Sequence, residues 1–485
     1  MSAQKSASVA ASRAGLYESP VQRALLPLAR RESVDTGAVS VAQGLSLRSN
    51  FVWMLTGNAF YAACQWGMIV ALARLGSSFM VGQFSLGLAI ATPVMMFTNL
   101  HLRAVQATDA RRFYYFAEYL HLRILMTSAA MVMIAGFALL GHHERGTAIV
   151  ILAVASAKGI ETLSDIHYGL FQLNDRLDET GKSMMLRGVL SVAGLSAGLY
   201  LTHKVFWGCV GMALLWLAAL LFFDVRRGRR FTARSEKLGF TAYRAGCCRL
   251  PHQAHGICRQ WNLVRLALPL GIVTTIASIN FNMPRYFIHA RMGEDKLGIF
   301  SALAYATVAM TLVCDSLGHC AIAGLSRLYA GGRRAEFRSL LLKLLAVGGA
   351  LGFAGLVIAQ VLGERLLAIV YSPEYAAYSR VFVLLVFAAS IYCITSMLTS
   401  GIMSARYFKI QVPMLGLVAG CNALACARLV PAAGLVGGAL AMLLAALVHL
   451  VLAAAVVGYV LLVPDKRAMN PKGPQLYTEN WEPGI

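Results

Sequence analysis

The chain has 485 residues, of which 58% are hydrophobic and only 13% are charged. Soluble domains carry about 25% charged residues, so the composition excludes an ordinary soluble protein and predicts an all-α integral membrane protein. The net charge of +21 does not indicate a nucleic-acid partner, because the basic residues gather in alternate loops between long apolar stretches.

The apolar stretches predict about twelve membrane-spanning helices, at roughly 20 residues for each crossing. In chain order they are 50–73, 79–100, 122–141, 147–171, 185–203, 205–224, 264–289, 297–325, 339–362, 379–403, 410–430 and 434–462. Every second loop is rich in Lys and Arg, while the loops between them are short and nearly free of both. This is the positive-inside pattern, and it predicts that both termini are cytoplasmic.

Two tails and one linker flank these helices. Residues 1–47 and 464–485 contain no long apolar run and no cleavable signal peptide, so we expect disordered cytoplasmic tails. The linker 225–262 is strongly basic and is expected to lie along anionic headgroups. Its Cys and His residues follow no standard zinc spacing, so we predict neither a metal site nor a cofactor. They are Cys247, Cys248, His252, His255 and Cys258.

A short pattern occurs twice and divides the chain into halves. The pattern A-R-x-G followed by G-x-F-S occupies 73–76 with 82–85, and again 290–293 with 298–301. The repeat predicts two six-helix bundles, 48–224 and 263–463, that run in the same direction through the membrane. In such a frame the working site lies between the halves.

The seventh span holds an unusual segment, N-F-N-M-P-R-Y-F-I-H at 280–289. Pro284 cannot donate to the carbonyl of Asn280, so the helix should bend there. Arg285 is a permanent cation that lipid penalises by about 2.5–3.5 kcal/mol or more. It either faces a cavity and holds an anion, as its fork geometry suits phosphate, or it snorkels outward to the headgroups. Asn282, and Gln65 at the equivalent position of the first half, would share the first role.

Other polar side chains inside the spans form three groups on single helix faces. Asn99 with Arg103, and Asp315 with His319, are each four residues apart near the cytoplasmic side. They predict either a substrate gate, with His319 open to protonation, or pairs that only stabilise packing. Lys158, Glu161 and Asp165 share one face of the fourth span and predict a salt-bridged brace or a cation-coupling site.

Several segments together carry a family resemblance that covers about 48–462. They are S-N-F-V-W at 49–53, A-R-L-G at 73–76, N-L-H-L-R at 99–103 with Asp109, P-R-Y at 284–286 and Y-S-P-E-Y at 371–375. The chain resembles the multidrug/oligosaccharidyl-lipid/polysaccharide (MOP) exporter superfamily, and within it bacterial O-antigen and exopolysaccharide flippases. The resemblance implies two helical bundles and alternating-access transport of a polyprenyl-diphosphate-linked oligosaccharide across the bacterial inner membrane.

The sequence leaves three functions in competition. The flippase is favoured, with lipid-linked oligosaccharide and anionic lipids as partners and a polysaccharide polymerase and other assembly proteins nearby. A cation-coupled multidrug antiporter of the same superfamily would suit the ionisable face of the fourth span. A membrane polymerase or glycosyltransferase is disfavoured, because a positioned acid or base needs a polar domain that the short outer loops do not provide. We therefore predict that the chain is not an enzyme.

Overall fold

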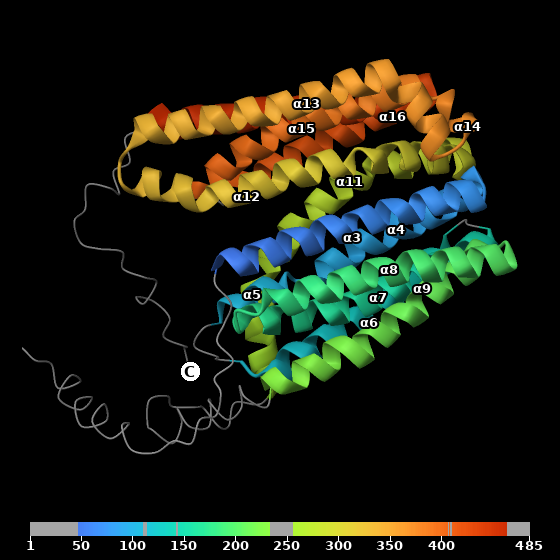
Figure 1. Cartoon of the computed structure of the whole chain (residues 1–485), viewed down its shortest axis with the longest axis horizontal. Helices are drawn as coiled ribbons and strands as arrows, with labels where there is room; N and C mark the ends of the chain where they lie inside the picture. The colour runs from blue at the N-terminus through green and yellow to red at the C-terminus, as the bar shows by residue number, and fades with distance from the viewer. Residues whose placement is uncertain are drawn as a thin grey trace, which may run out of the picture. The chain divides into compact units, whose positions relative to one another are not determined.

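The computed structural model describes residues 47–109, 114–141, 144–232, 256–405, 407 and 410–462. Nearly all of these residues are helical, with no strand among them, so the predicted all-α class is confirmed (Figure 1). Residues 1–46 and 463–485 lie outside the described part, and so do the linker residues 233–255 and all five side chains of the Cys/His cluster.

The first half contains seven helices and one π-helical turn. They are α3 (Leu47–Leu75), α4 (Ser78–Asn99), α5 (Leu102–Thr108), α6 (Phe116–Leu140), α7 (Arg145–Leu173), α8 (Leu177–Thr202), α9 (Val205–Ala219) and the turn η1 (Leu220–Val225). The second half contains α11 (Gly256–Ala306), α12 (Val308–Ala330), α13 (Arg334–Val370), α14 (Pro373–Ala376), α15 (Ser379–Ser404) and α16 (Gln411–Leu462). Helix continues past η1 to Thr232, into the segment predicted as linker.

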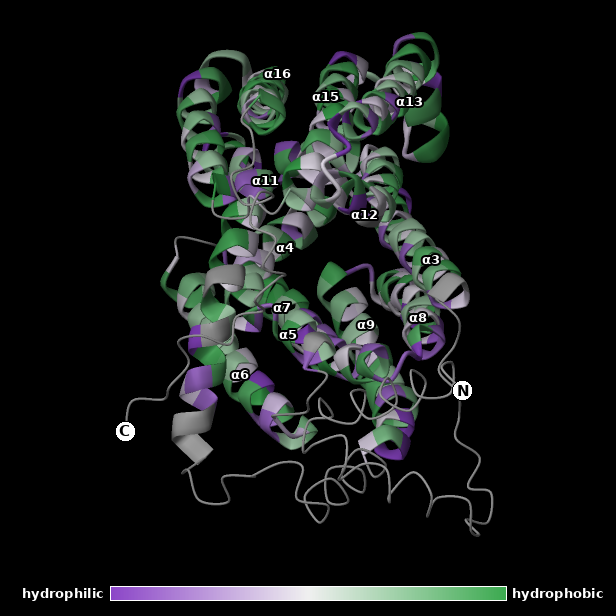
Figure 2. Cartoon of the chain, turned by 90° about the vertical axis from the view of Figure 1, so that its left-hand side faces the viewer, coloured by the Kyte–Doolittle hydropathy of each residue, from purple (hydrophilic) through white to green (hydrophobic). Residues whose placement is uncertain are grey.

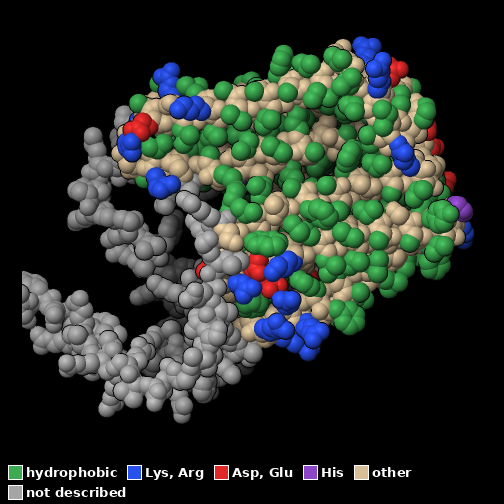
Figure 3. Space-filling view, in the orientation of Figure 1, with side chains coloured by type: hydrophobic (Ala, Val, Ile, Leu, Met, Phe, Trp, Pro, Cys, Tyr) green, Lys and Arg blue, Asp and Glu red, His purple; other side chains and the backbone are tan. Residues whose placement is uncertain are grey.

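Nine helical stretches in the described part are long and apolar enough to cross a membrane, which makes this a multi-pass membrane protein. Figure 3 shows apolar side chains over the middle of the face, with Lys and Arg gathered toward its two ends. Two of the stretches, Gly271–Ala330 and Gln411–Leu462, are far longer than one crossing needs. They are interrupted at Gly293 (φ 79°), in the gap between the predicted spans 264–289 and 297–325, and at Gly434 (φ 58°), the first residue of the predicted span 434–462. The count of twelve remains a prediction.

Each half packs mainly within itself, and α4 and α11 provide the main contact between the halves (Figures 1 and 2). In the first half α3 packs on α8, α8 on α9, and α7 on α4 and α6. In the second half α15 packs on α12, α13 and α16. The beginning of α11 also reaches the first half, because Leu263 and Ala267 share a buried cluster with Leu102 and Leu122.

The two copies of the repeated pattern meet at one end of the α4–α11 contact. A methyl group added at Gly82 would lie 1.9 Å from the carbonyl oxygen of Glu294, and one added at Gly298 would lie 1.9 Å from that of Ser78. Only glycine permits so close an approach of two backbones. The contact is reciprocal, as expected when equivalent segments face each other across a two-fold axis.

Hydrogen bonds reinforce this end, which we call the closed end. Ser78 donates to Asp295 at 3.0 Å and the Arg74 Nε donates to the Val370 carbonyl at 2.8 Å. The Trp66 indole donates to the Tyr371 hydroxyl at 2.9 Å, and that hydroxyl donates to the Ala302 carbonyl at 2.8 Å. Burial raises the pKa of Tyr371 to about 12, so this hydroxyl stays protonated.

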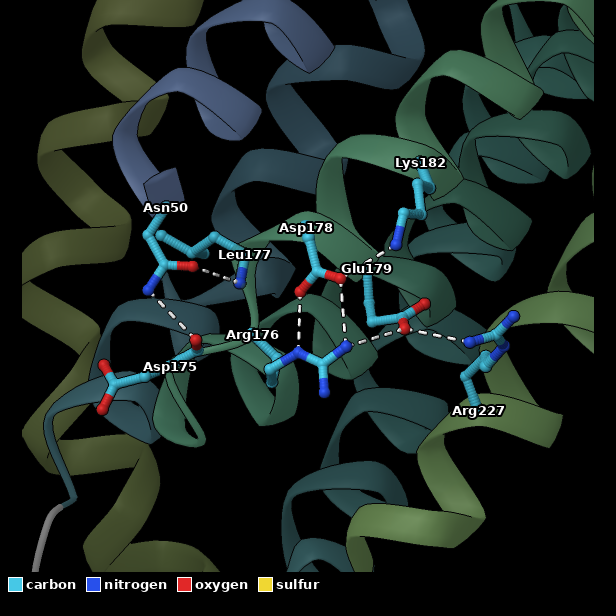
Figure 4. Close-up of polar contacts among 8 residues, drawn as sticks. All are labelled: Asn50, Asp175, Arg176, Leu177, Asp178, Glu179, Lys182 and Arg227. Atoms are coloured by element: carbon cyan, nitrogen blue, oxygen red, sulfur yellow. Dashed lines mark hydrogen bonds and ion pairs between the residues drawn. The ribbon is translucent and has the colours of Figure 1, made fainter. Parts of the chain in front are cut away.

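An ion-pair network braces the opposite end of the first half (Figure 4). Asp178 accepts from Arg176 at 2.8 Å and from Lys182 at 2.9 Å, and Glu179 accepts from Arg227 at 2.9 Å. Both carboxylates are buried, so their cations supply the hydrogen bonds that water cannot.

Asn50 ties α3 to the α7–α8 turn beside this network (Figure 4). Its Nδ2 donates to the Asp175 carbonyl at 3.0 Å, and its Oδ1 accepts from the Leu177 amide at 3.1 Å. We expect Asn50→Ala to lower the free energy of unfolding by about 1–3 kcal/mol, because both backbone groups lose their partner. Thermal unfolding in detergent measures the loss. Thr56→Ala is the matched control, since Thr56 is exposed and bonds only its own helix. Equal melting temperatures for the two variants would contradict the assignment.

Candidate functional site

A cavity of about 720 Å³ opens between α3, α4, α5, α7, α11 and α12. Its wall includes six of the polar side chains that the sequence singled out: Asn99, Arg103, Lys158, Glu161, Asp165 and His319. The remaining lining residues are Met54, Thr92, Met95, Met96, His101, Ala104, Thr162, Gln172 and Thr274. Both halves of the chain therefore contribute to one polar chamber.

The ionisable face of α7 points into this chamber. The Lys158 Nζ lies 2.5 Å from the Glu161 carboxylate, which also accepts from the Tyr61 hydroxyl of α3 at 2.6 Å. The side chains of Lys158, Glu161 and Asp165 are half-buried, with 23–28% of each exposed. The spacing on one helix face brings them together, as the sequence predicted. Tyr61 is a partner that the sequence analysis missed.

Asp165 is held between two arginines from different elements. Its oxygens lie 3.3 Å from Arg103 on α5 and 3.4 Å from Arg123 on α6. Arg123 is fully buried and also donates to the carbonyl and the side-chain oxygen of Asn99. Arg123 was not predicted, although an arginine at the start of an apolar span was a signal that could have identified it.

The charges around the cavity favour an anion. Arg103, Lys158 and Arg123 outnumber the carboxylates of Glu161 and Asp165 by one. The imidazole rings of His101 and His319 also lie on the cavity wall. Each carboxylate already has a cationic partner, so an anionic ligand would compete for guanidinium and ammonium groups that are in place.

The backbone is strained where α4 ends and α5 begins. Leu100 and His101 both adopt left-handed conformations, with φ of 48° and 53°. Such a conformation costs a non-glycine residue roughly 1–2 kcal/mol. The turn places Arg103 on a short separate helix beside Asp165, and the hydrogen bonds from Arg123 to Asn99 hold the end of α4.

The predicted pair on α12 is divided between two environments. His319 is exposed and lines the cavity. Asp315 instead accepts from the hydroxyls of Ser396 at 2.6 Å and Tyr392 at 3.3 Å, both on α15. Asp315 therefore joins α12 to α15 and does not line the chamber.

Arg285 lies away from the cavity lining and is buried, with 3% of its surface exposed. It donates to the Asn282 Oδ1 at 2.5 Å, and its guanidinium lies over the rings of Phe281 and Tyr305 at 4.9 and 5.4 Å. Its Nε has no hydrogen-bond partner, and within the described part no carboxylate lies within 4.0 Å of it. The guanidinium does not snorkel outward to the headgroups.

The Asn280 carbonyl, to which Pro284 cannot donate, accepts a hydrogen bond from another residue. Asn422 of α16 is buried and donates its Nδ2 to the carbonyl and the Oδ1 of Asn280, at 2.9 Å each. The only non-helical backbone in the described course of α11 is at Gly293, beyond Pro284. The Nε2 of Gln65 is buried without a partner. The carbonyl released by proline was a signal for a donor such as Asn422, but not for its position in the sequence.

Comparison with known proteins gives one sequence relative and several structural neighbours. No family model matches the chain. The capsular polysaccharide biosynthesis protein CapF of Staphylococcus aureus is 26% identical over 409 residues, which cover 83% of this chain and 97% of the relative. The lipid II flippase MurJ, in an inward closed conformation, aligns over 84% of this chain and 87% of its own, with a TM-score of 0.63 and 11% identity. An inward-facing multidrug resistance MATE family transporter of the MOP superfamily aligns over 87% and 97%, with a TM-score of 0.57 and 11% identity.

The chain has the MOP superfamily fold. The resemblance in the sequence is thereby confirmed. The structural neighbours with this MOP fold are a flippase and a transporter, not enzymes. Within the described part of the chain, no three His, Cys, Asp or Glu side chains are grouped as a metal site would require.

Proposed function

We propose that the chain is a flippase that moves a polyprenyl-diphosphate-linked oligosaccharide across the bacterial inner membrane by alternating access. The observation that carries this proposal is the cationic cavity between the halves, which lies apart from the closed end. Transport of this kind needs no covalent chemistry. The cavity holds the anionic headgroup, the prenyl chain stays in lipid, and rocking of the halves opens the other side.

The proposed substrate class rests on the cationic cavity and on the similarity to CapF and MurJ. Clustered arginine and lysine side chains bind the oxygens of a diphosphate through charge-assisted hydrogen bonds. The relative CapF is named for capsular polysaccharide biosynthesis, and MurJ for flipping lipid II. The proposed cargo is therefore the repeat unit of a capsule, an O-antigen or an exopolysaccharide.

We assign the diphosphate two successive contacts. Arg103 and His319 in the cavity form the cytoplasmic contact. Arg285 lies eleven residues, about three turns or 16 Å, beyond the cavity-lining Thr274 on the same face of α11. Arg285 lacks a carboxylate partner, so it can receive an anion without giving up an ion pair. It forms the release-side contact once the halves move apart at the closed end, with Asn280, Asn282 and Gln65 as neighbours.

The partners follow from the same proposal. In this scheme both termini are cytoplasmic, and the basic loops on that side contact anionic lipids. A polysaccharide polymerase on the outer side would consume the translocated unit. We do not propose nucleic acid as a partner.

A cation-coupled multidrug antiporter is the second candidate, favoured by the MATE neighbour and by the carboxylates of Glu161 and Asp165. Both carboxylates are paired with cations, which leaves little attraction for a cationic drug. A polymerase or glycosyltransferase is weaker still, because every carboxylate of the cavity wall is paired in this way.

Complementation of a deletion strain tests the proposal. We expect deletion to remove surface polysaccharide, the wild-type chain to restore it, and Arg285→Ala to fail at normal protein level. Loss of Arg285 removes the charged hydrogen bonds of the release-side contact, at about 1.5–3 kcal/mol each. Quantitative surface-polysaccharide staining measures the outcome. Unchanged polysaccharide in the deletion strain, combined with new drug sensitivity, would favour the antiporter instead.

A further inference from the structure

A cluster of buried polar side chains lies inside the first half, away from the cavity wall. Asp224 in η1 is completely buried, with 0% of its surface exposed. Its Oδ1 accepts from the Ser183 hydroxyl at 2.6 Å, while its Oδ2 has no hydrogen-bond partner. No cation of the described residues lies within 4.0 Å of the carboxyl group. A bare ionised oxygen in so dry a place is strongly unfavourable, whereas a protonated one is not.

The backbone around Asp224 is also unusual. Residues Leu220–Val225 form a π-helical turn between two α-helical segments. Single π-turns within α-helices cost stability and occur frequently at functional sites. Here the turn belongs to a helix that crosses the membrane, Val205–Thr232.

The groups that face Asp224 come from α7 and α8. His167 is engaged through its Nδ1 with the Leu163 carbonyl at 3.0 Å, and the Ser164 hydroxyl has no hydrogen-bond partner. Arg187 donates to the Ile160 carbonyl at 3.2 Å and lies over the Trp216 ring at 5.2 Å. Neither His167 nor Arg187 forms an ion pair with Asp224, so Oδ2 can bind a proton and then donate a hydrogen bond to the Ser164 hydroxyl that faces it.

Two lines of contacts connect Asp224 with the cavity. The Ser183 hydroxyl donates its hydrogen bond to Asp224. The Tyr168 hydroxyl, 2.8 Å from the Ser183 hydroxyl, must therefore donate to Ser183. The Tyr168 ring lies under the guanidinium of Arg103, 5.5 Å from its centre. Along the second line, Arg187 faces both Asp224 and the cavity-lining Glu161.

We propose that Asp224 is a proton-binding site coupled to anion binding in the cavity. The proton comes from water and binds Oδ2 without any bond to carbon breaking. Uptake removes one negative charge beside Arg187 and Tyr168, which leaves the cavity more positive and strengthens anion binding at Arg103. By reciprocity, a bound anion favours the protonated form of Asp224. The coupling rests on the proposed function, since it presumes that the cavity binds the transported anion.

The test uses the full-length protein in lipid nanodiscs with two readouts. The first is binding of prenyl-diphosphate-linked N-acetylglucosamine, a diester whose phosphates stay ionised, at mildly acidic and mildly alkaline pH. The second is the infrared band of the protonated carboxylic acid after a pH step. We expect the wild type to bind the probe at least roughly fivefold more tightly at mildly acidic pH than at mildly alkaline pH. Asp224→Asn, a neutral isostere, should bind tightly at both pH values and lose the infrared band.

Controls separate the possible failures. Glu336→Gln removes an exposed carboxylate paired with Arg333, and should keep both the pH dependence and the band. Ser183→Ala removes the donor to the ionised form, so the band should titrate at higher pH; an unmoved band would overturn the proposal. The proposal would also be overturned if probe binding by Asp224→Asn kept the pH dependence of the wild type, or if probe binding depended on sodium and not on pH. If the probe binds no variant while the band still disappears in Asp224→Asn, the proposed function fails and the proton site stands.

Discussion

Replacing Arg103 with alanine is expected to weaken binding of the lipid-linked diphosphate by roughly 10- to 100-fold and to remove surface polysaccharide. Arg103 is the arginine on the cavity wall, and a hydrogen bond to a charged group contributes about 1.5–3 kcal/mol. Its loss also leaves Asp165 with Arg123 alone, which makes the chamber less positive. Equilibrium binding in nanodiscs and quantification of surface polysaccharide measure the two effects.

Arg338→Ala is the matched control, because Arg338 is exposed and lies away from the cavity wall. It should leave both readouts unchanged. A second variant, Arg103→Lys, keeps the charge and loses the fork, so intermediate affinity is expected. Full affinity in Arg103→Ala would exclude the cavity as the cytoplasmic anion site.

Gly82→Ala is expected to prevent the closed end from forming. The added methyl group would lie 1.9 Å from the carbonyl oxygen of Glu294, so the two backbones must separate. Overpacking of this kind costs about 1–3 kcal/mol or more, enough to shift the ratio of closed to open states by roughly 5- to 150-fold. Export should fall accordingly. Labelling of a cysteine introduced at Ser78 is expected to report the opening, because Ser78 contacts Asp295 across the closed end in this structure.

The control makes the same change where space exists. Gly136 on α6 has nothing within 4 Å of an added methyl group, so Gly136→Ala should preserve export and labelling. Gly298→Ala should reproduce Gly82→Ala, because its methyl group would lie equally close to the Ser78 carbonyl. Normal export in both closed-end variants would show that the transport cycle does not need the Gly82–Gly298 contact.

The sequence predicted the cavity in part because some of its side chains share one helix. Lys158, Glu161 and Asp165 lie at helical spacing, so one face of α7 had to carry them together whatever surrounded it. Asn99 and Arg103 were predicted to share one helix face, but the left-handed residues Leu100 and His101 separate α4 from α5 between them, and both still line the cavity. The partners of these groups, Tyr61 and Arg123, come from other helices, and no local spacing relates them.

Arg285 and Asp224 show what the local sequence could not predict. Pro284 and Arg285 stood out because proline and arginine oppose an apolar helix, and local chemistry predicted a free carbonyl at Asn280. The donor that satisfies it, Asn422, lies 142 residues away. Asp224 is the last residue of the predicted span 205–224, where the sequence gives no sign of burial, yet it lies in the π-helical turn and is completely buried.

Composition and hydropathy by themselves determined that this is a helical, multi-pass membrane protein, because lipid leaves apolar helices few alternatives. The local segments determined the superfamily resemblance, and the glycine pattern marked the segments that meet at the closed end. Only the tertiary structure decided which ionisable groups share the cavity, which are paired elsewhere, and that Asp224 is left with a bare oxygen. Pairing and burial depend on helices far apart in the sequence, and the distances between their side chains exist only once the helices have packed.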